Sequence, residues 1–475
     1  MLKRVRQREI VVCSTDKTGK LTVCSLETYK EMGMKHVEGD KEIDREDVKR
    51  VQSQLNQHVS MWLRFSGAGD QWGQEDRFRR TMINHSECVP PLSLLVKDHK
   101  TWAKGDLPPT RPVVSGNASM GVHLNNILSE VVEGLADKME GSTELLSGED
   151  FLSKVDKHNE AVEGDIKEGG VGKEDLILIG TDAVCLFPSL DAEECAKLVA
   201  EEYRGSSYDM RITDWREVMR YLKLTLPRSR LLKEGLGRLI PWRKYKYGKE
   251  PGLQSATARG KEVKEEEEQF VFPDVEPTKW ETNVMISLAL EVGIKASFKL
   301  HTYTFGGKIY MQLKGGPIGA RLTVAVSRVV MELWRRRVRL SLTEAGLKLL
   351  IDCGYVDDMR HLLELFQRGW RWDDVEGRFR HCIELEEQDV GKTRKEITCK
   401  EILKMMNGIF PFIKFTLEEQ EMFADGYLPT LDTRVRLMNN GIIDYRFYEK
   451  EMTNTVCLRK KAALGKQLKK SVLIA

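Results

Sequence analysis

Apolar residues recur at helical spacing in two long segments of the chain. The first segment runs from about Asp44 to Leu63, and the second from Gly121 to Met139. One apolar face with this period is typical of a helix packed against a core, so we predict an amphipathic helix in each segment. The expected core-facing positions are Val48, Val51, Leu55, Val59, Trp62, Leu63, Leu124, Ile127, Leu128, Val131, Val132 and Leu135.

Shorter apolar runs bounded by glycine, proline or polar residues predict strands. Two runs around a glycine-containing turn predict a hairpin over residues 9–25, and two runs punctuated by prolines predict another over residues 89–116. Ser189 is the expected N-cap of a helix from Leu190 to Tyr203. Further strands are expected over 176–181, 303–310, 347–353, 435–437 and 442–447, and a long helix over 320–340.

Polar segments separate these elements. Residues 140–174 are rich in Gly, Asp and Glu and predict a loop or helix–loop insertion. A charged helical region is expected between residue 358 and about Met406. The most basic segment, residues 211–250, interleaves cations with Trp and Tyr. That mixture suits the backbone and bases of a nucleic acid, although a solvated helical face has the same composition.

The composition indicates a globular protein with a highly charged surface. The 475 residues are 41% hydrophobic and 31% charged with a net charge of +2, so any nucleic-acid surface must come from local clusters of Lys and Arg. The nine cysteines form no C-x-x-C pair, which argues against a zinc ribbon or disulfide framework and for a reducing compartment. Neither a signal peptide nor a membrane-spanning stretch is expected, which predicts the cytoplasm or the nucleus.

Tyr355-Val356-Asp357-Asp358, named here the acidic turn, follows the mostly apolar run of residues 347–353. Neighbouring carboxylates repel one another and are costly to bury unless a cation lies between them. A divalent metal such as Mg²⁺, which prefers oxygen ligands, would meet that need. A surface turn rich in Asp is the alternative. Asp182 interrupts another apolar run, either as a third ligand or as a buried acid bonded to nearby backbone.

Two further segments carry candidate binding residues. A hairpin over 89–116 would bring three cations together as a triphosphate clamp, unless they belong to a solvated basic loop. These cations are Lys97, Lys100 and Arg111. The segment Gln312–Gly319, named here the glycine loop, precedes the predicted long helix. Its glycines would let a flat ring or a backbone approach closely, or would form a plain connection.

In order along the chain, these segments resemble the palm and fingers of a reverse transcriptase. Asp182 to Phe187 resembles motif A, the glycine loop resembles motif B through Gln312, Gly315 and Pro317-Ile318-Gly319, and the acidic turn resembles motif C. The chain is most similar to the Penelope-like retroelements, over residues 10–458. The further motifs of this resemblance are Asp16–Gly19, Val96–Lys100, Arg111–Ser115, Ile413–Thr416, Leu428–Asp432 and Arg446–Thr455.

The resemblance implies an α+β right-hand polymerase fold. Its fingers would combine helices and hairpins, its palm would be an antiparallel sheet backed by helices, and its thumb would be short or absent. The implied division has an N-terminal region with fingers over 1–175 and a palm over 176–458 with a charged insertion at about 204–300. A basic tail or truncated thumb would occupy residues 459–475.

The resemblance also implies an RNA-directed DNA polymerase that uses an RNA template, a DNA primer and dNTPs. Asp182, Asp357 and Asp358 would be the catalytic residues and would bind two Mg²⁺ ions, or Mn²⁺ in their place. Phe187 would exclude a ribose 2′-hydroxyl, and Lys414 could donate a proton to the leaving pyrophosphate. The other implied nucleotide-binding residues are Lys97, Lys100, Arg111, Gln312, Gly315, Gly316 and Gly319.

Three departures from the family pattern keep alternatives open. Ala320–Val324 replaces the Ser-Pro-Leu-Ser-Pro of motif B, little chain follows the last motif, and no GIY-YIG nuclease follows it. A catalytically inactive or co-opted nucleic-acid-binding protein is therefore an alternative. An RNA-templated RNA polymerase would share the palm, but a small polar residue in place of Phe187 would better admit a 2′-hydroxyl.

Overall fold

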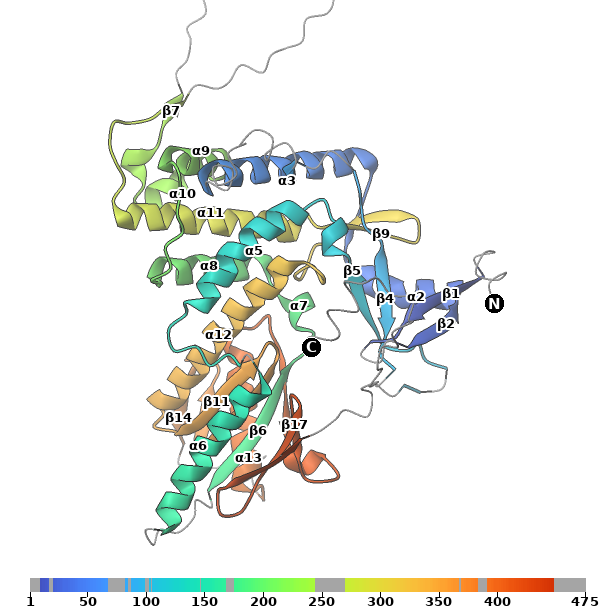
Figure 1. Ribbon diagram of the computed structural model, residues 1–475, viewed down its shortest axis with the longest axis vertical. Helices are drawn as coiled ribbons and strands as arrows, with labels where there is room; N and C mark the ends of the chain where they lie inside the picture. Colours follow the sequence, from blue (N-terminus) through green and yellow to red (C-terminus); the bar gives the residue numbers. More distant parts are fainter. Residues whose placement is uncertain are drawn as a thin grey trace, which may run out of the picture.

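The computed structural model describes residues 9–16, 20–66, 82–83, 87–98, 102–103, 105–145, 147–167, 175–243, 270–366, 369–382 and 391–447. These residues form a mixed helix and sheet structure in which the named strands pair in antiparallel fashion. Figure 1 shows a layer of helices above a larger sheet, with several small hairpins beside them.

The helical layer is built around α11 (Lys279–Lys299). All residues from Val284 to Glu291 are buried, so this helix is enclosed on every side instead of presenting one apolar face. Residues 279–299 fall in the segment 204–300 that we predicted as a charged insertion. The charged residues of that segment lie before α11, whereas α11 itself is mostly apolar. The surrounding helices are α3 (Arg45–Ser66), α5 (Val122–Asp137), α8 (Ala192–Gly205), α9 (Trp215–Thr225), α10 (Arg228–Lys233) and α12 (Arg321–Glu344).

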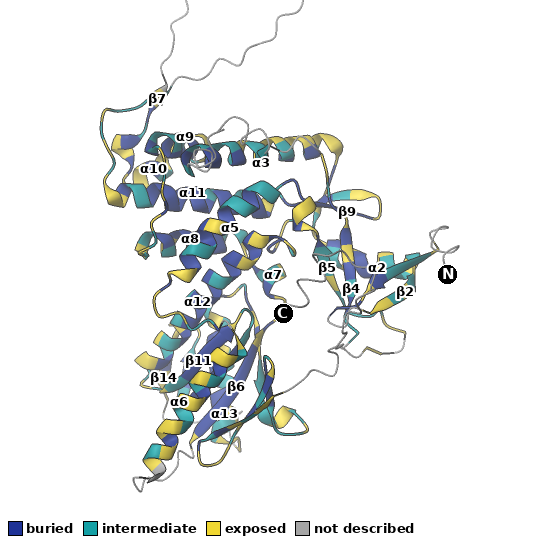
Figure 2. Ribbon diagram, in the orientation of Figure 1, coloured by how far each residue is buried: buried dark blue, intermediate teal, exposed yellow. Residues whose placement is uncertain are grey.

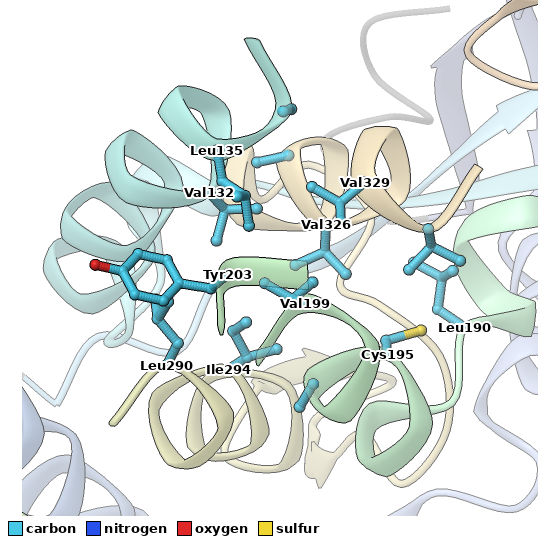
Figure 3. Close-up of a cluster of buried hydrophobic side chains, with 14 of the residues drawn as sticks. Val132, Leu135, Leu190, Cys195, Val199, Tyr203, Leu290, Ile294, Val326 and Val329 are labelled. Atoms are coloured by element: carbon cyan, nitrogen blue, oxygen red, sulfur yellow. The ribbon is translucent and has the colours of Figure 1, made fainter. Parts of the chain in front are cut away.

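Side chains from α5, α8, α11 and α12 meet in one core. Figure 3 shows Val132 and Leu135 facing Val199 and Tyr203, with Val326 beside them. Both predicted amphipathic helices are confirmed as α3 and α5, and only Ile127 among their predicted core positions is half-buried. Figure 2 shows the same pattern, with buried residues on the inward faces of these helices.

The small hairpins lie at one side of the helical layer (Figure 1). The predicted hairpins over 9–25 and 89–116 are confirmed, but residues 303–310 are not one strand. Gly306 and Gly307 have φ values of 60° and 86° and turn the chain back within that segment, as a two-residue hairpin turn requires. The elements are β1 (Ile10–Ser14), β2 (Leu21–Ser25), α2 (Leu26–Val37), β3 (Lys41–Ile43), β4 (Leu92–Val96), β5 (Thr110–Val114), β9 (Thr302–Phe305) and β10 (Lys308–Met311).

The larger sheet has the strand order β11-β12-β6-β15. One face packs on α12 and α13, and the other packs on α6 and on the small sheet β16-β17-β18. Because both faces of the sheet are covered, the strand sequences contain apolar runs and do not alternate strictly between apolar and polar residues. The elements are β6 (Leu176–Ala183), β11 (Leu349–Tyr355), β12 (Asp358–Glu364), β15 (Phe415–Glu419), α6 (Gly148–Lys167), α13 (Arg394–Ile409), β16 (Leu428–Thr430), β17 (Thr433–Leu437) and β18 (Ile443–Phe447).

Two local predictions need correction, and a third is narrowed to one of its alternatives. The region after the acidic turn is not helical at first, because β12 and the hairpin β13 (Trp370–Asp373) and β14 (Arg378–His381) precede α13. Ser189 ends a short helix, α7 (Leu186–Ser189), and Asp191 caps α8 by accepting hydrogen bonds from two backbone N–H groups at 2.9 Å. The polar segment 140–174, predicted as a loop or a helix–loop insertion, contains the long helix α6, which agrees with the second of these alternatives.

Candidate active site

The acidic turn closes the β11–β12 hairpin with only two residues, Val356 and Asp357, between paired Tyr355 and Asp358. Val356 has a φ of 57°, in the left-handed region. A β-branched residue held there costs about 1–3 kcal/mol, and such strain gathers at functional sites. Gly354 leaves room beneath the turn, since a Cβ there would lie 2.5 Å from the Arg335 Nη1 atom.

Three acids are brought to the same end of the sheet. Asp358 on β12 lies directly opposite Asp182 on β6. The backbone N–H of Ala183 donates to the carbonyl oxygen of Asp357 at 3.3 Å, which places Asp357 beside the end of β6. Asp182 is exposed and the other two acids are half-buried. The sequence alone could not show that Asp182 and Asp357, which are 175 residues apart in the chain, are neighbours.

Arg360 is a buried cation next to this acid group, and the sequence reading missed it. Its Nη1 atom donates to the Asp358 Oδ1 atom at 2.5 Å and to the Met359 carbonyl at 2.7 Å. Its Nε atom donates to the Thr430 Oγ1 atom at 2.8 Å, and its Nη2 atom donates to the Pro429 carbonyl. Residues two apart on a strand lie on the same face of the sheet. Predicting a strand here would therefore have placed Arg360 beside Asp358.

The acids suit Mg²⁺ in chemistry and number. Mg²⁺ commonly takes one or two protein carboxylates and completes its coordination with water and substrate phosphates. Asp182 and Asp357 could supply two such carboxylates. Among the residues that the structure describes, no group of three or more His, Cys, Asp or Glu is arranged to hold a metal ion. The predicted three-carboxylate ligand set therefore stays a prediction.

The glycine loop packs against two other candidate segments. The backbone N–H of Gly316 donates to the Phe187 carbonyl at 2.7 Å, and a Cβ on Gly315 would meet Pro188 backbone at 2.7 Å. At the other end of the loop, a Cβ on Gly319 would lie 2.3 Å from the Val114 carbonyl oxygen. The side chain of Gln312 donates to backbone carbonyls within the loop. The glycines are thus required for close backbone packing between segments far apart in the sequence.

The predicted cation clamp is described in part. The Arg111 Nη1 atom lies 3.3 Å from an oxygen of Asp16, a nearly buried carboxylate at the end of the first hairpin. Lys97 follows β4 and is half-buried, with its backbone N–H bonded to Pro109. Lys100 and residues 17–19 of the first hairpin lie outside the described residues. Arg111 and Lys97 are therefore on one hairpin, with Asp16 as a partner that orients the arginine.

Phe187 and Lys414 both lie near the acidic end of the sheet. Phe187 is half-buried in α7, which follows Asp182 after a turn through Cys185, whose φ is 51°. Lys414 directly precedes β15, and its carbonyl accepts a hydrogen bond from the backbone N–H of Val184 at 2.7 Å. Its exposed side chain lies 3.4 Å from the Asn407 carbonyl. The roles predicted for both residues, as sugar gate and as proton donor, stay predictions.

A buried ionic network supports the acidic turn from the α12 side. Glu332 accepts hydrogen bonds from Arg335 at 2.7 Å and from Arg339 at 3.0 Å. Arg339 also donates to Asp352 on β11 at 2.7 Å, and a nitrogen of His361 on β12 lies 3.0 Å from the same carboxylate. Burial alone would raise the pKa of Asp352, but hydrogen bonds from His361 and Arg339 lower it. The network fixes both strands of the hairpin to one helix.

Four arginines of the basic segment 211–250 pair with acids among the residues that the structure describes. Arg238 donates to both oxygens of Glu281 at 2.7 and 2.5 Å, which lowers the pKa of that carboxyl to about 2. Three further arginines of the segment are paired in the same way: Arg216 with Glu276, Arg220 with Glu217, and Arg230 with Glu234 and Glu291. Trp215 and Tyr221 are buried. These contacts favour a structural role for this part of the segment; residues 244–250 lie outside the described residues.

No protein-family model and no curated protein sequence matches this chain. Among solved structures, it is similar to telomerase from Candida albicans in complex with a fragment of telomeric RNA, with 10% identity, a TM-score of 0.43, and coverage of 95% of this chain and 57% of that one. It is also similar to apo telomerase from Candida tropicalis, with 10% identity, a TM-score of 0.43, and coverage of 94% and 57%. A form of that enzyme truncated from its C-terminal domain gives 8% identity, a TM-score of 0.42, and coverage of 92% and 63%. The chain thus spans about three fifths of the length of these telomerase chains. No helix in the described part of the chain could cross a membrane.

Proposed function

We propose that this chain is an RNA-directed DNA polymerase of a retroelement, with a right-hand polymerase fold. The observation that carries the proposal is the meeting of three separate segments at one end of the sheet. Asp182 lies opposite Asp358, and the glycine loop packs directly onto Phe187. In this reading the sheet and its covering helices are the palm, and the small hairpins belong to the fingers.

The residues divide the work of nucleotidyl transfer between them. Asp182 and Asp357, with Asp358 as a further candidate, would bind Mg²⁺, which when bound lowers the pKa of the primer 3′-hydroxyl and neutralises the triphosphate. Arg111 and Lys97 would bind the triphosphate oxygens, with Lys100 as a third cation. Phe187 would pack on the sugar of the incoming dNTP and exclude a 2′-hydroxyl. Lys414 would donate a proton to the leaving pyrophosphate.

The test is primer extension on an RNA template with dNTPs and Mg²⁺. Asp357→Asn should abolish extension because it removes a proposed ligand while keeping nearly the same shape. Asp156→Asn, which neutralises an exposed acid on α6, is the matched control and should extend as the wild type does. Equal extension by the wild type and Asp357→Asn would refute the assignment of the acidic turn.

The co-opted nucleic-acid-binding protein remains the alternative function. Running the same assay with dNTPs and NTPs on RNA and DNA templates separates the candidates. Binding of template–primer without extension under any condition would favour the co-opted protein. Preferential extension with NTPs would favour an RNA-templated RNA polymerase.

A further inference from the structure

Arg360 places a positive charge beside Asp358 and Asp182, two acids that face each other on adjacent strands. Like charges directly opposite one another on adjacent strands are destabilising. Asp358 and Asp182 occupy such positions, and Arg360 lies two residues along β12 on the same face of the sheet. Gly180, opposite Arg360 on β6, has no side chain there, and a Cβ would lie 2.8 Å from the Arg360 Nη1 atom. The absence of that side chain makes space for the guanidinium.

The guanidinium also links β12 to β16 by polar contacts, in addition to the apolar contacts between the two sheets. Arg360 is 3% exposed, and its bonds reach Asp358, Thr430 and the Pro429 carbonyl. Thr430 and Pro429 belong to β16, which lies on the face of the sheet that α6 also covers. Glu418 on β15 lies 3.9 Å from the same group. A planar cation with five donors can hold these partners at once, which a single ammonium cannot.

We infer that Arg360 is a positioning residue that turns the Asp358 carboxylate away from the metal and toward the β16–β17 hairpin. This inference rests on the proposed function, because it concerns the ligands of the proposed metal. It assigns the metal to Asp182 and Asp357 alone and gives Asp358 a different task. Asp358 then links the strand that carries the acidic turn to the hairpin beside it, through Arg360.

The experiment measures Mn²⁺ affinity by electron paramagnetic resonance alongside primer extension. Asp357→Asn should weaken Mn²⁺ binding at least about tenfold more than Asp358→Asn does, since loss of a ligand exceeds the screened field of one nearby charge. Arg360→Gln should tighten Mn²⁺ binding by about tenfold because it releases a third carboxylate. Adding Asp358→Asn to Arg360→Gln should remove that gain. A merely structural arginine would not give this reversal.

Arg360→Lys serves as a second variant if Arg360→Gln does not fold. This variant keeps the positive charge but loses the planar guanidinium, so it should tighten Mn²⁺ binding less than Arg360→Gln does. The inference is overturned if Asp358→Asn weakens Mn²⁺ binding as much as Asp357→Asn, whether or not the wild type extends primers. Failure of wild-type extension together with the expected Mn²⁺ pattern would refute the proposed function and leave this inference standing. Absence of Mn²⁺ binding by the wild type would refute both.

Discussion

The contact between Gly319 and the backbone around Val114 gives a sharp test of how the glycine loop is held. Gly319 has a φ of 102°, and a Cβ there would lie 2.3 Å from the Val114 carbonyl oxygen. The reciprocal position is equally tight, since a Cβ on Gly116 would lie 2.2 Å from the Gly319 carbonyl oxygen. Both obstacles are backbone atoms, which cannot rotate away as a side chain can. We therefore expect Gly319→Ala to destabilise the protein and to displace the loop.

The magnitude follows from two separable costs. Forcing alanine into the left-handed region costs about 1–2 kcal/mol, and overpacking adds about 1–3 kcal/mol, so Gly319→Ala should lose about 2–5 kcal/mol. Gly346→Ala isolates the strain, because Gly346 has a φ of 70° and open space around it, and should lose about 1–2 kcal/mol. Gly116 has no positive φ, so Gly116→Ala isolates the overlap and should lose about 1–3 kcal/mol.

Urea unfolding followed by circular dichroism measures all three variants, and primer extension follows the function. Gly319→Ala and Gly116→Ala should both slow extension, because each displaces the glycine loop from Phe187. Gly346→Ala should extend at the wild-type rate. A free energy of unfolding for Gly319→Ala no lower than that of Gly346→Ala would show that the loop does not abut Val114 and would refute the reasoning.

Three further predictions concern charge, pH and sugar selection. Arg335→Met should lower the free energy of unfolding in urea by about 3–5 kcal/mol because it leaves Glu332 buried with fewer partners. Lys49→Met, which breaks an exposed pair with Glu46, is the control and should leave the urea midpoint unchanged. Burial lowers the pKa of both His58 and His301 to about 4. As the pH drops from about 6.5 to 4, these histidines bind protons in the unfolded chain but not in the folded one, so the free energy of unfolding should fall. The double variant His58→Gln, His301→Gln should flatten that part of a thermal-denaturation pH profile, and an unchanged slope would refute the assignment. Phe187→Ala should raise ribonucleotide incorporation relative to deoxynucleotide incorporation, and unchanged discrimination would remove the proposed role of this side chain.

Local pattern was enough to predict elements whose neighbours impose a single buried face. α3 is the best example, because all six of its predicted core positions are buried. The two hairpins over 9–25 and 89–116 were predictable from turn residues and short apolar runs. The contact between Asp182 and the acidic turn could be expected only through the family resemblance, since neither segment's local sequence predicts which strands pair.

Two of the misses, β12 and the basic segment 211–250, have a common physical cause, because their charged residues have partners in other elements. β12 contains Asp358, Arg360 and His361, which read as a solvated helix until their buried partners on β6, β11 and β16 are known. The basic segment 211–250 looked like a nucleic-acid surface for the same reason. Its partners include Glu276, Glu281 and Glu291, which lie 43 to 61 residues along the chain from the arginines they bind.

Two strained backbone positions and a pair of facing acids lie at one end of the larger sheet, and that combination argues for function there independently of any resemblance. Val356 and Cys185 both adopt left-handed backbone at the same end of the sheet, and Asp182 faces Asp358 between them. A fold selected only for stability would remove such strain and repulsion. Here large cores on both faces of the sheet hold the strands in place, and Arg360 and the Glu332 network fix the hairpin. The cost is retained beside Asp182 and Asp357, the two acids that would hold a cation, which is why loss of Asp357 should affect chemistry far more than stability.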